Sequence, residues 1–218
     1  MVLDSYRRAA DRILTPMAVR IRRVTPNVLS WISLVTAGLA GLFLALAGFL
    51  NEVIALAAAF IALSVSSLLD ALDGKVARLR GIASPRGDFM DHVFDRYADV
   101  FILTGLFFSI YARQPIAFFG LLGVLLTSYL GTQAQAVGIG RLYGGLLGRA
   151  DRLVILLVFL LLHLFFDPSE PLLFLGLGVL RFTMMEYALL LFGILGNLTA
   201  IQRGVEAWKR LGAGEGSG

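Results

Sequence analysis

Six aspartates lie between two long apolar runs, in the stretch LLDALDGKVARLRGIASPRGDFMDHVFDRYAD. They are Asp70, Asp73, Asp88, Asp91, Asp95 and Asp99. Carboxylates at membrane depth are costly and usually serve chemistry. Asp70 and Asp73 are three residues apart at the end of one predicted helix, and Asp91 and Asp95 are four apart at the start of the next. Both spacings place the two carboxylates of a pair on one helix face.

Four carboxylates that face one another repel strongly unless cations lie between them. Divalent metals that prefer oxygen ligands are the usual solution in proteins. Phosphoryl transfer uses such ions, because two of them about 3.5–4 Å apart neutralise the phosphate oxygens and the leaving group. We therefore expect two Mg²⁺ ions, with Mn²⁺ as the alternative. The expected ligands are Asp70, Asp73, Asp91 and Asp95.

The remaining polar residues near this cluster allow simpler interpretations. Asp99 lies two turns beyond Asp91, deeper in the apolar run, and we expect it to pair with Arg96 rather than to bind metal. Asp88 fits a helix cap or an ion pair as well as it fits a site. His92 is one position off the carboxylate face of its helix.

The composition favours a membrane protein. The chain has 218 residues, of which 58% are hydrophobic and only 16% are charged, unlike a typical soluble domain. It has no cysteine, which excludes disulfides, thiol nucleophiles and zinc–thiolate sites. Its first segment is polar and rich in arginine, so we do not expect a cleavable signal peptide. We expect no nucleic-acid partner.

Apolar runs long enough to cross a bilayer predict six transmembrane helices. They cover residues 28–50, 53–72, 90–112, 115–137, 152–167 and 183–203. The fifth is short for a span. Because residues 171–180 are also apolar, the sequence does not fix the residue at which this span ends. The sequence thus predicts an all-α, polytopic membrane protein. Its expected parts are an amphipathic surface helix in residues 1–25, a six-span domain in residues 26–208 and a disordered tail in residues 209–218.

The placement of basic residues predicts the orientation. Lysines and arginines concentrate at both ends of the chain and in the connections 73–90 and 138–152. Basic loops remain on the cytoplasmic side, so both termini and the aspartate segment are expected there. Glycines 38, 41 and 48 suit close helix packing, and we expect a homodimer. Glu186 fits either a helix start or a dimer contact.

The aspartates form part of a longer pattern, Asp70-x-x-Asp73-Gly74-x-x-Ala77-Arg78 followed by Gly87-x-x-x-Asp91-x-x-x-Asp95. This pattern resembles the signature of the CDP-alcohol phosphatidyltransferase family, and all eight of its positions are present. The segments Thr25–Asn27 and Asn197–Arg203 also resemble the family, so the resemblance covers most of the chain. It implies transfer of a phosphatidyl or archaetidyl group from a CDP-activated lipid to a polar alcohol, with release of CMP.

The resemblance also implies roles for individual residues. The donor would be CDP-diacylglycerol or CDP-archaeol. The residues implied to bind its CDP part are Asp70, Asp73, Gly74, Ala77, Arg78 and Gly87. Asp95 would be the general base that accepts the proton of the attacking hydroxyl. The residue types agree, because Gly74 and Ala77 let a nucleotide approach the helix backbone and Arg78 can bind phosphate oxygens through its forked guanidinium.

A second basic group follows the fourth predicted span and suggests where the acceptor binds. Arg141, Arg149 and Arg152 could bind a phosphorylated alcohol, or they could anchor the loop to lipid phosphates. The stretch GRADRL, with Arg152, resembles the start of the fifth span in enzymes that use inositol phosphate. In those enzymes, however, the fourth span ends in a stretch resembling RARAEG, where this chain has QAQAVG. Inositol phosphate is our first choice of acceptor and glycerol 3-phosphate the second, with serine open.

Two other functional classes predict different sequences. An ion-coupled transporter would have charged residues scattered over several spans and interrupted helices in matched halves, neither of which is present. A non-catalytic scaffold related to the family would be expected to lack a signature aspartate, and none is missing. The sequence therefore favours an enzyme.

Overall fold

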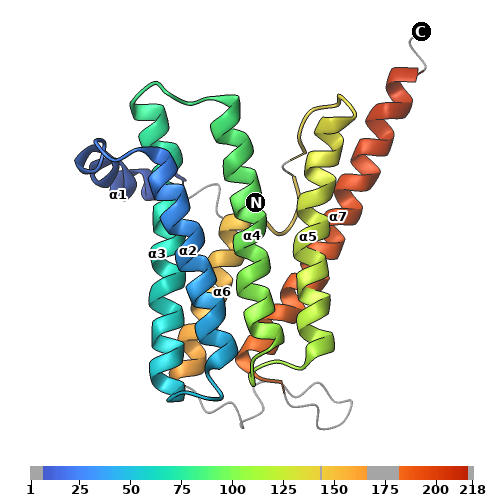
Figure 1. Ribbon diagram of the computed structural model, residues 1–218. Coiled ribbons are helices and arrows are strands. Elements are labelled where there is room, and N and C mark those ends of the chain that lie inside the picture. The colour runs from blue at the N-terminus through green and yellow to red at the C-terminus, as the bar shows by residue number, and fades with distance from the viewer. Residues whose placement is uncertain (1–6, 143, 166–181, 216–218) are drawn as a thin grey trace.

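The computed structural model describes residues 7–142, 144–165 and 182–215, and within these residues it consists of seven α-helices without strands. The helices are α1 (Arg7–Arg20), α2 (Pro26–Leu46), α3 (Glu52–Leu79), α4 (Pro85–Phe107), α5 (Gln114–Ala136), α6 (Arg149–Phe165) and α7 (Met184–Glu215). Helix α1 projects from one side of the bundle, and α6 lies behind α2 and α4 in this view (Figure 1). The predicted all-α class is confirmed.

Local signals fix the turn that brings the two aspartate pairs together. Gly81 follows α3 with a φ of 65°, a left-handed conformation that glycine adopts without strain. Helix α4 then begins at Pro85, and the hydroxyl of Ser84 caps it by accepting a hydrogen bond of 3.2 Å from the Gly87 amide. The chain therefore reverses direction within a few residues, and the end of α3 lies beside the start of α4.

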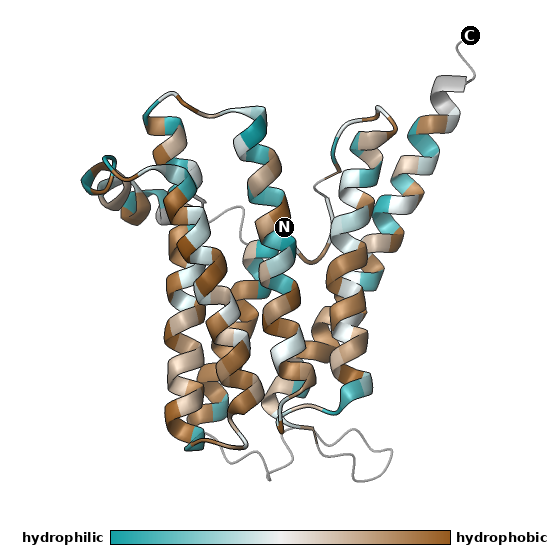
Figure 2. Cartoon of the chain, in the orientation of Figure 1, coloured by the Kyte–Doolittle hydropathy of each residue, from teal (hydrophilic) through white to brown (hydrophobic). Residues whose placement is uncertain are grey.

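The chain is an integral membrane protein. Four helices of the described residues are long and apolar enough to cross a membrane, namely α2, α3, α5 and α7. Hydrophobic residues dominate the middle and one end of the bundle, whereas hydrophilic residues gather at the end that carries the α3–α4 turn (Figure 2). The end of the predicted span 152–167 and the apolar residues 171–180 fall outside the described residues.

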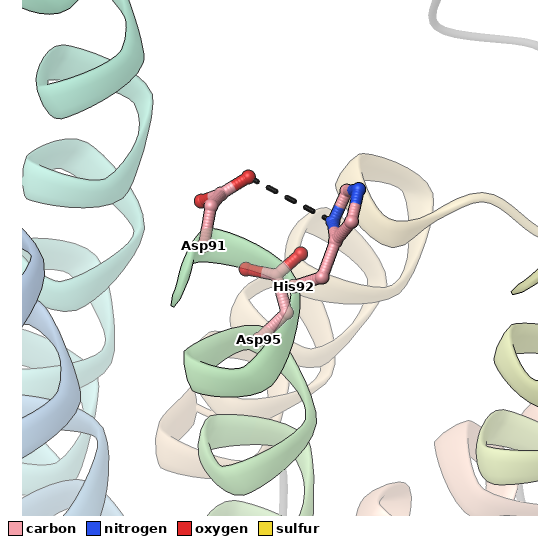
Figure 3. Close-up of side chains that lie close together, drawn as sticks. All are labelled: Asp91, His92 and Asp95. Atoms are coloured by element: carbon pink, nitrogen blue, oxygen red, sulfur yellow. Dashed lines mark ion pairs between the residues drawn. The ribbon is translucent and has the colours of Figure 1, made fainter. Parts of the chain in front are cut away.

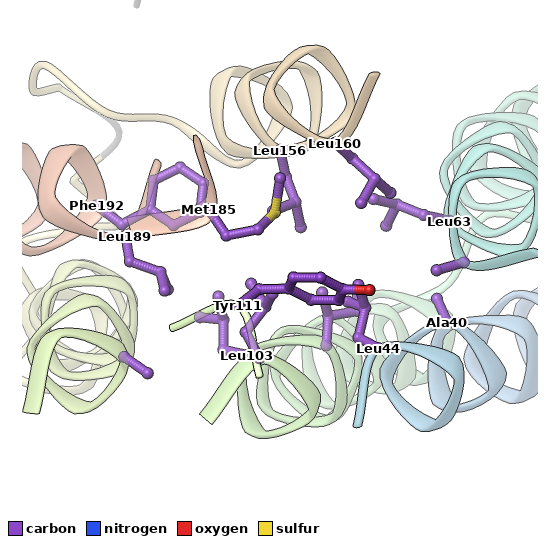
Figure 4. Packing of buried hydrophobic residues seen from close by; sticks show 14 of the residues in the cluster. Ala40, Leu44, Leu63, Leu103, Tyr111, Leu156, Leu160, Met185, Leu189 and Phe192 are labelled. Carbon is purple, nitrogen blue, oxygen red and sulfur yellow. The ribbon is translucent and has the colours of Figure 1, made fainter. Parts of the chain in front are cut away.

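The core joins most of the helices through one cluster of buried hydrophobic side chains. Helix α2 packs against α3 and α4, and α5 packs against α7. Buried residues of α2, α3, α4, α6 and α7 meet in one cluster, with Leu44, Leu103, Leu160 and Phe192 among them (Figure 4). Helix α1 docks on α3 separately, because Ala18 is fully buried in a small cluster with Leu72 and Val76 of α3.

Helix α7 is longer than the sequence predicted. It continues to Glu215, so residues 209–215 are helical where a disordered tail was expected, and residues 216–218 lie outside the described part. Arg210 Nε lies 2.7 Å from Glu206 Oε1 one turn earlier, a spacing that stabilises helices. Hydropathy indicates where a helix leaves an apolar environment, but it does not indicate where the helix ends.

Glu186 begins α7 and also holds it to the connection between α4 and α5. The carboxylate accepts a hydrogen bond of 3.2 Å from the Thr183 amide, and the Thr183 hydroxyl accepts one of 3.1 Å from the Glu186 amide, which is a capping box. Arg113 binds the same carboxylate through Nε at 2.7 Å and Nη2 at 2.9 Å. The interpretation of Glu186 as a helix-start residue is confirmed.

Replacing Arg113 with alanine should destabilise the protein by about 1–2 kcal/mol, because the carboxylate of Glu186 is only 3% exposed and would lose two charged donors. The expected loss of stability is modest, because Arg113 itself is half exposed and partly solvated. Thermal unfolding of the purified protein would measure the effect. Arg210→Ala is the control, because it removes an exposed pair and should change stability by less than about 0.5 kcal/mol.

Candidate active site

The carboxylates of the signature meet where α3 ends and α4 begins. Asp70, Asp73 and Asp91 each contribute an oxygen, and these oxygens lie within 4.8 Å of one another. Asp91, His92 and Asp95 form a second group with the same spacing (Figure 3). Asp91 belongs to both groups, so the four aspartates predicted as metal ligands form one continuous cluster.

The cluster has the donor atoms that a divalent metal ion requires. Asp73 and Asp95 are only 5% and 6% exposed, and like charges at such short range need a cation to remain ionised. Asp95 Oδ1 is buried and lies 2.6 Å from Arg149 Nη1. Carboxylate oxygens are the ligands that Mg²⁺ and Mn²⁺ prefer. The residues therefore fit a divalent metal, as the sequence predicted.

A cavity of about 370 Å³ opens beside the cluster. Its walls come from the start of α2, the end of α3 and the start of α4. Among the residues that line it are Asp73, Gly74, Ala77, Arg78, Gly87 and Asp91. Asp70 lines a smaller adjoining space with Asp73, Asp91 and Arg149. The structure thus brings together all six residues that the sequence assigned to the CDP part of a donor.

The glycine of this pattern lies next to the arginine one turn later. A Cβ atom built on Gly74 would lie 3.4 Å from Nη1 of Arg78, at the short end of ordinary van der Waals contact. The Arg78 side chain lines the cavity together with Gly74. An arginine in such a wall can donate two parallel hydrogen bonds to a phosphate.

The three arginines predicted to bind the acceptor do not share one place. Arg149 Nη1 lies 2.5 Å from Asp70 Oδ2 and 2.6 Å from Asp95 Oδ1. Arg152 is buried, and it pairs with Asp99 at 3.3 Å and donates a hydrogen bond to the Val124 carbonyl.

Arg141 contacts His92 and lines a different cavity, of about 280 Å³, between α4 and α5. Ser128 and Thr132 of α5 line the same cavity. The geometry therefore divides the basic group of the sequence into three separate environments.

Two residues at the site carry roles that the sequence analysis missed. Arg96 Nη1 lies 3.1 Å from Asp99 Oδ2, which confirms the expected pair, and its Nη2 lies 3.7 Å from Asp95 Oδ2. Ser30 of α2 donates a hydrogen bond of 2.5 Å to Asp73 Oδ2. The position of Arg96 next to Asp95 was a usable signal. Ser30 is 43 residues from Asp73, and nothing local to it indicated the contact.

Replacing Ser30 with alanine should weaken metal binding about tenfold, since groups that hydrogen-bond to a metal ligand typically contribute that much to affinity. The Ser30 hydroxyl fixes the orientation of the buried Asp73 carboxylate. Titrating Mn²⁺ into the purified variant and following free Mn²⁺ would measure the change. Thr36→Ala on the same helix is the control, because that hydroxyl bonds only to backbone of its own helix among the described contacts.

Comparison with known proteins identifies the family. Residues 23–194 match the family described as CDP-alcohol phosphatidyltransferase. The chain belongs to the CDP-alcohol phosphatidyltransferase family. It is therefore a membrane-embedded transferase of phospholipid biosynthesis, and the transporter and scaffold alternatives are not favoured.

Relatives within this family share much of the chain. The chain is 33% identical over 154 residues to an archaetidylinositol phosphate synthase of Pyrococcus horikoshii, with 71% of each protein covered. It is 28% identical over 210 residues to an archaetidylinositol phosphate synthase of Methanothermobacter thermautotrophicus, with 96% of each covered.

A solved structure of the family is similar throughout. The crystal structure of Mycobacterium tuberculosis phosphatidylinositol phosphate synthase with CDP-DAG bound has a TM-score of 0.69 and 25% identity, covering 90% of this chain and 94% of that one. A second structure of that enzyme, in complex with manganese and citrate, has a TM-score of 0.71 and 25% identity over 89% of this chain and 88% of that one. Manganese in this relative supports a divalent metal in the family fold.

Proposed function

We propose that the protein transfers the archaetidyl or phosphatidyl group of a CDP-activated lipid to a hydroxyl of inositol phosphate and releases CMP. The observation that carries the proposal is the cavity of about 370 Å³ that joins Arg78 to the aspartate cluster. A guanidinium and a carboxylate-bound metal beside an open wall can together bind the phosphates of a nucleoside diphosphate. The names of the relatives support inositol phosphate as the acceptor.

In this proposal the four signature aspartates hold two Mg²⁺ ions, with Mn²⁺ able to replace them. The ions would supply charge neutralisation on the phosphate oxygens and on the departing CMP. Arg78, which lines the same cavity, binds a phosphate oxygen of the donor. Gly74, Ala77 and Gly87 allow the nucleotide to lie against the helix backbones.

Asp95 acts as the general base. Its carboxylate accepts the proton of the acceptor hydroxyl, whose oxygen forms a bond to the β-phosphorus of the donor. The bond between that phosphorus and the bridging oxygen breaks, and CMP leaves with the electron pair. Arg96 and Arg149 lie 3.7 Å and 2.6 Å from the two oxygens of Asp95, so they hold the carboxylate in a fixed orientation.

The membrane arrangement is part of the proposal. Helices α4 and α6 join α2, α3, α5 and α7 to make six spans, as the sequence predicted. Helix α1 belongs to the surface segment 1–25, because Arg12 and Arg20 are exposed while Ala18 is buried against α3. Residues 26–208 form the catalytic domain, with the aspartate end and both termini on the cytoplasmic side.

We also propose that the protein forms a homodimer. The glycines that suggested it in the sequence give it little support in the structure. Gly41 meets the backbone of Phe101, Gly48 meets the side chain of Ile110 and Gly38 faces Phe101, all in the same chain. These glycines are used within the protomer. Cross-linking in native membranes would test the dimer.

The acceptor can be tested directly. The purified protein would be incubated with Mg²⁺ and CDP-archaeol or CDP-diacylglycerol, together with inositol phosphate, glycerol 3-phosphate or serine. CMP release and the mass of the lipid product are the measurements. An inositol phosphate lipid supports the proposal, a glycerophosphate lipid makes glycerol 3-phosphate the acceptor, and absence of CMP with every pair contradicts it.

A further inference from the structure

Arg149 occupies a central position among the charged residues of the site. It begins α6, and its Nη1 atom lies 2.5 Å from Asp70 Oδ2 on α3 and 2.6 Å from Asp95 Oδ1 on α4. Its side chain is largely shielded from solvent, with 23% exposed. A single guanidinium therefore joins carboxylates from two other helices.

The other cations near the site are used differently. Arg96 is 3.7 Å from Asp95 and closer to Asp99, and Arg152 pairs with Asp99, which lies outside the signature. Arg78 lines the donor cavity, and none of the ion pairs seen among the described residues joins it to the cluster. Among the described contacts, Arg149 is thus the main compensating charge for Asp70 and Asp95.

A guanidinium and a divalent cation make competing demands on these carboxylates. Both need oxygen lone pairs of Asp70 and Asp95, and they repel each other at short range. Thermodynamic linkage makes the effect mutual, so a contact that favours Arg149 on the carboxylates weakens metal binding by the same factor.

We propose that Arg149 is a built-in counter-ion of the metal site, which holds Asp70 and Asp95 facing each other and sets the affinity for divalent cations by competing with them. This role rests on the proposed assignment of both aspartates as metal ligands. It replaces acceptor binding as the function of this arginine, because its Nη1 is already directed at two carboxylates. The consequence is a site that stays folded without metal and binds the ion reversibly.

Titration of Mn²⁺ into the purified full chain, in detergent and without any CDP-lipid, tests the proposal. Electron paramagnetic resonance of free Mn²⁺ gives the Kd. Arg149→Gln removes the charge and should lower the Kd about tenfold, which corresponds to about 1.4 kcal/mol. Arg149→Lys keeps the positive charge on a compact, more strongly hydrated ammonium, so it should lower the Kd by a smaller factor, about threefold.

The outcomes separate this role from a merely structural one. A structural residue would weaken metal binding when removed, so a Kd at or above that of the unaltered protein in both variants overturns the proposal. If Arg149→Gln does not fold, the direction of change in Arg149→Lys decides. Arg86→Gln removes an exposed charge at the start of α4 and should leave the Kd unchanged.

The same Mn²⁺ titration also tests the proposed metal site itself. If the unaltered protein binds no Mn²⁺, the assignment of the aspartates as ligands is wrong. If it binds Mn²⁺ and the Arg149 variants do not bind it more tightly, only the counter-ion role is excluded.

Discussion

Asp95→Asn is expected to lower CMP release from a CDP-lipid by about a thousandfold, the contribution that a positioned general base commonly makes. The amide has the shape of the carboxylate but cannot accept the proton of the acceptor hydroxyl. Asp95 is 6% exposed, so bulk water has little access to replace it as the base. Initial rates of CMP formation at saturating lipid and acceptor are the measurement.

Two comparisons make this result specific. Glu206→Gln changes an exposed carboxylate of α7 to an amide and should retain full activity. Size-exclusion chromatography and thermal unfolding should show that Asp95→Asn remains folded, since an amide oxygen can still face Arg149. Undiminished CMP release by the folded variant would exclude Asp95 as the base.

The aspartate cluster was predictable because it depends on local geometry. Helical periodicity alone places Asp70 with Asp73 and Asp91 with Asp95. The tight connection between α3 and α4 then brings the two pairs together, and its signals, Ser84 with Pro85, are readable in sequence. The fold class followed from composition for a similar reason, since a bilayer requires long apolar helices.

The roles of the arginines were not predictable, because they depend on contacts between distant segments. Arg149 is 79 residues from Asp70, and their meeting requires α6 to pack beside α3. The sequence placed Arg149 in a basic group with Arg141 and Arg152, because neighbouring charges suggest one shared ligand. Nothing in the local pattern shows that Asp99 already neutralises Arg152 or that Arg149 binds two carboxylates.

Helix lengths show the same limit of hydropathy. The predicted span 53–72 marks the apolar part of α3, but the helix runs from Glu52 to Leu79 and carries Asp73 and Arg78 beyond the apolar run. The predicted span 90–112 likewise misses the first turn of α4, which begins at Pro85. Asp73, Arg78 and Gly87 of the signature lie on these polar extensions, whereas Asp70, Asp91 and Asp95 lie at the ends of the predicted spans.

The position of α4 depends on a close crossing with α2. A Cβ atom on Gly41 would lie 2.2 Å from the carbonyl oxygen of Phe101, and one on Gly105 would lie 2.2 Å from the carbonyl oxygen of Gly41. Both obstacles are backbone atoms, so no side-chain rotation can relieve the clash. One turn earlier on α2, a Cβ on Gly38 would be 3.6 Å from the ring of Phe101, an ordinary contact.

Gly41→Ala should therefore force α2 and α4 apart and destabilise the protein by about 3 kcal/mol, at the upper end of typical overpacking costs. Activity should fall with it, because α4 carries Asp91 and Asp95, and its displacement would move these carboxylates away from Asp70 and Asp73 on α3. Thermal unfolding of purified protein and CMP release are the two measurements.

Gly38→Ala adds the same methyl group to the same helix. Because alanine has a better helix propensity than glycine, this variant should have equal stability or gain up to about 1 kcal/mol. Equal unfolding temperatures for the two variants would show that the helices can separate at this crossing without cost, and would remove it as the feature that positions α4.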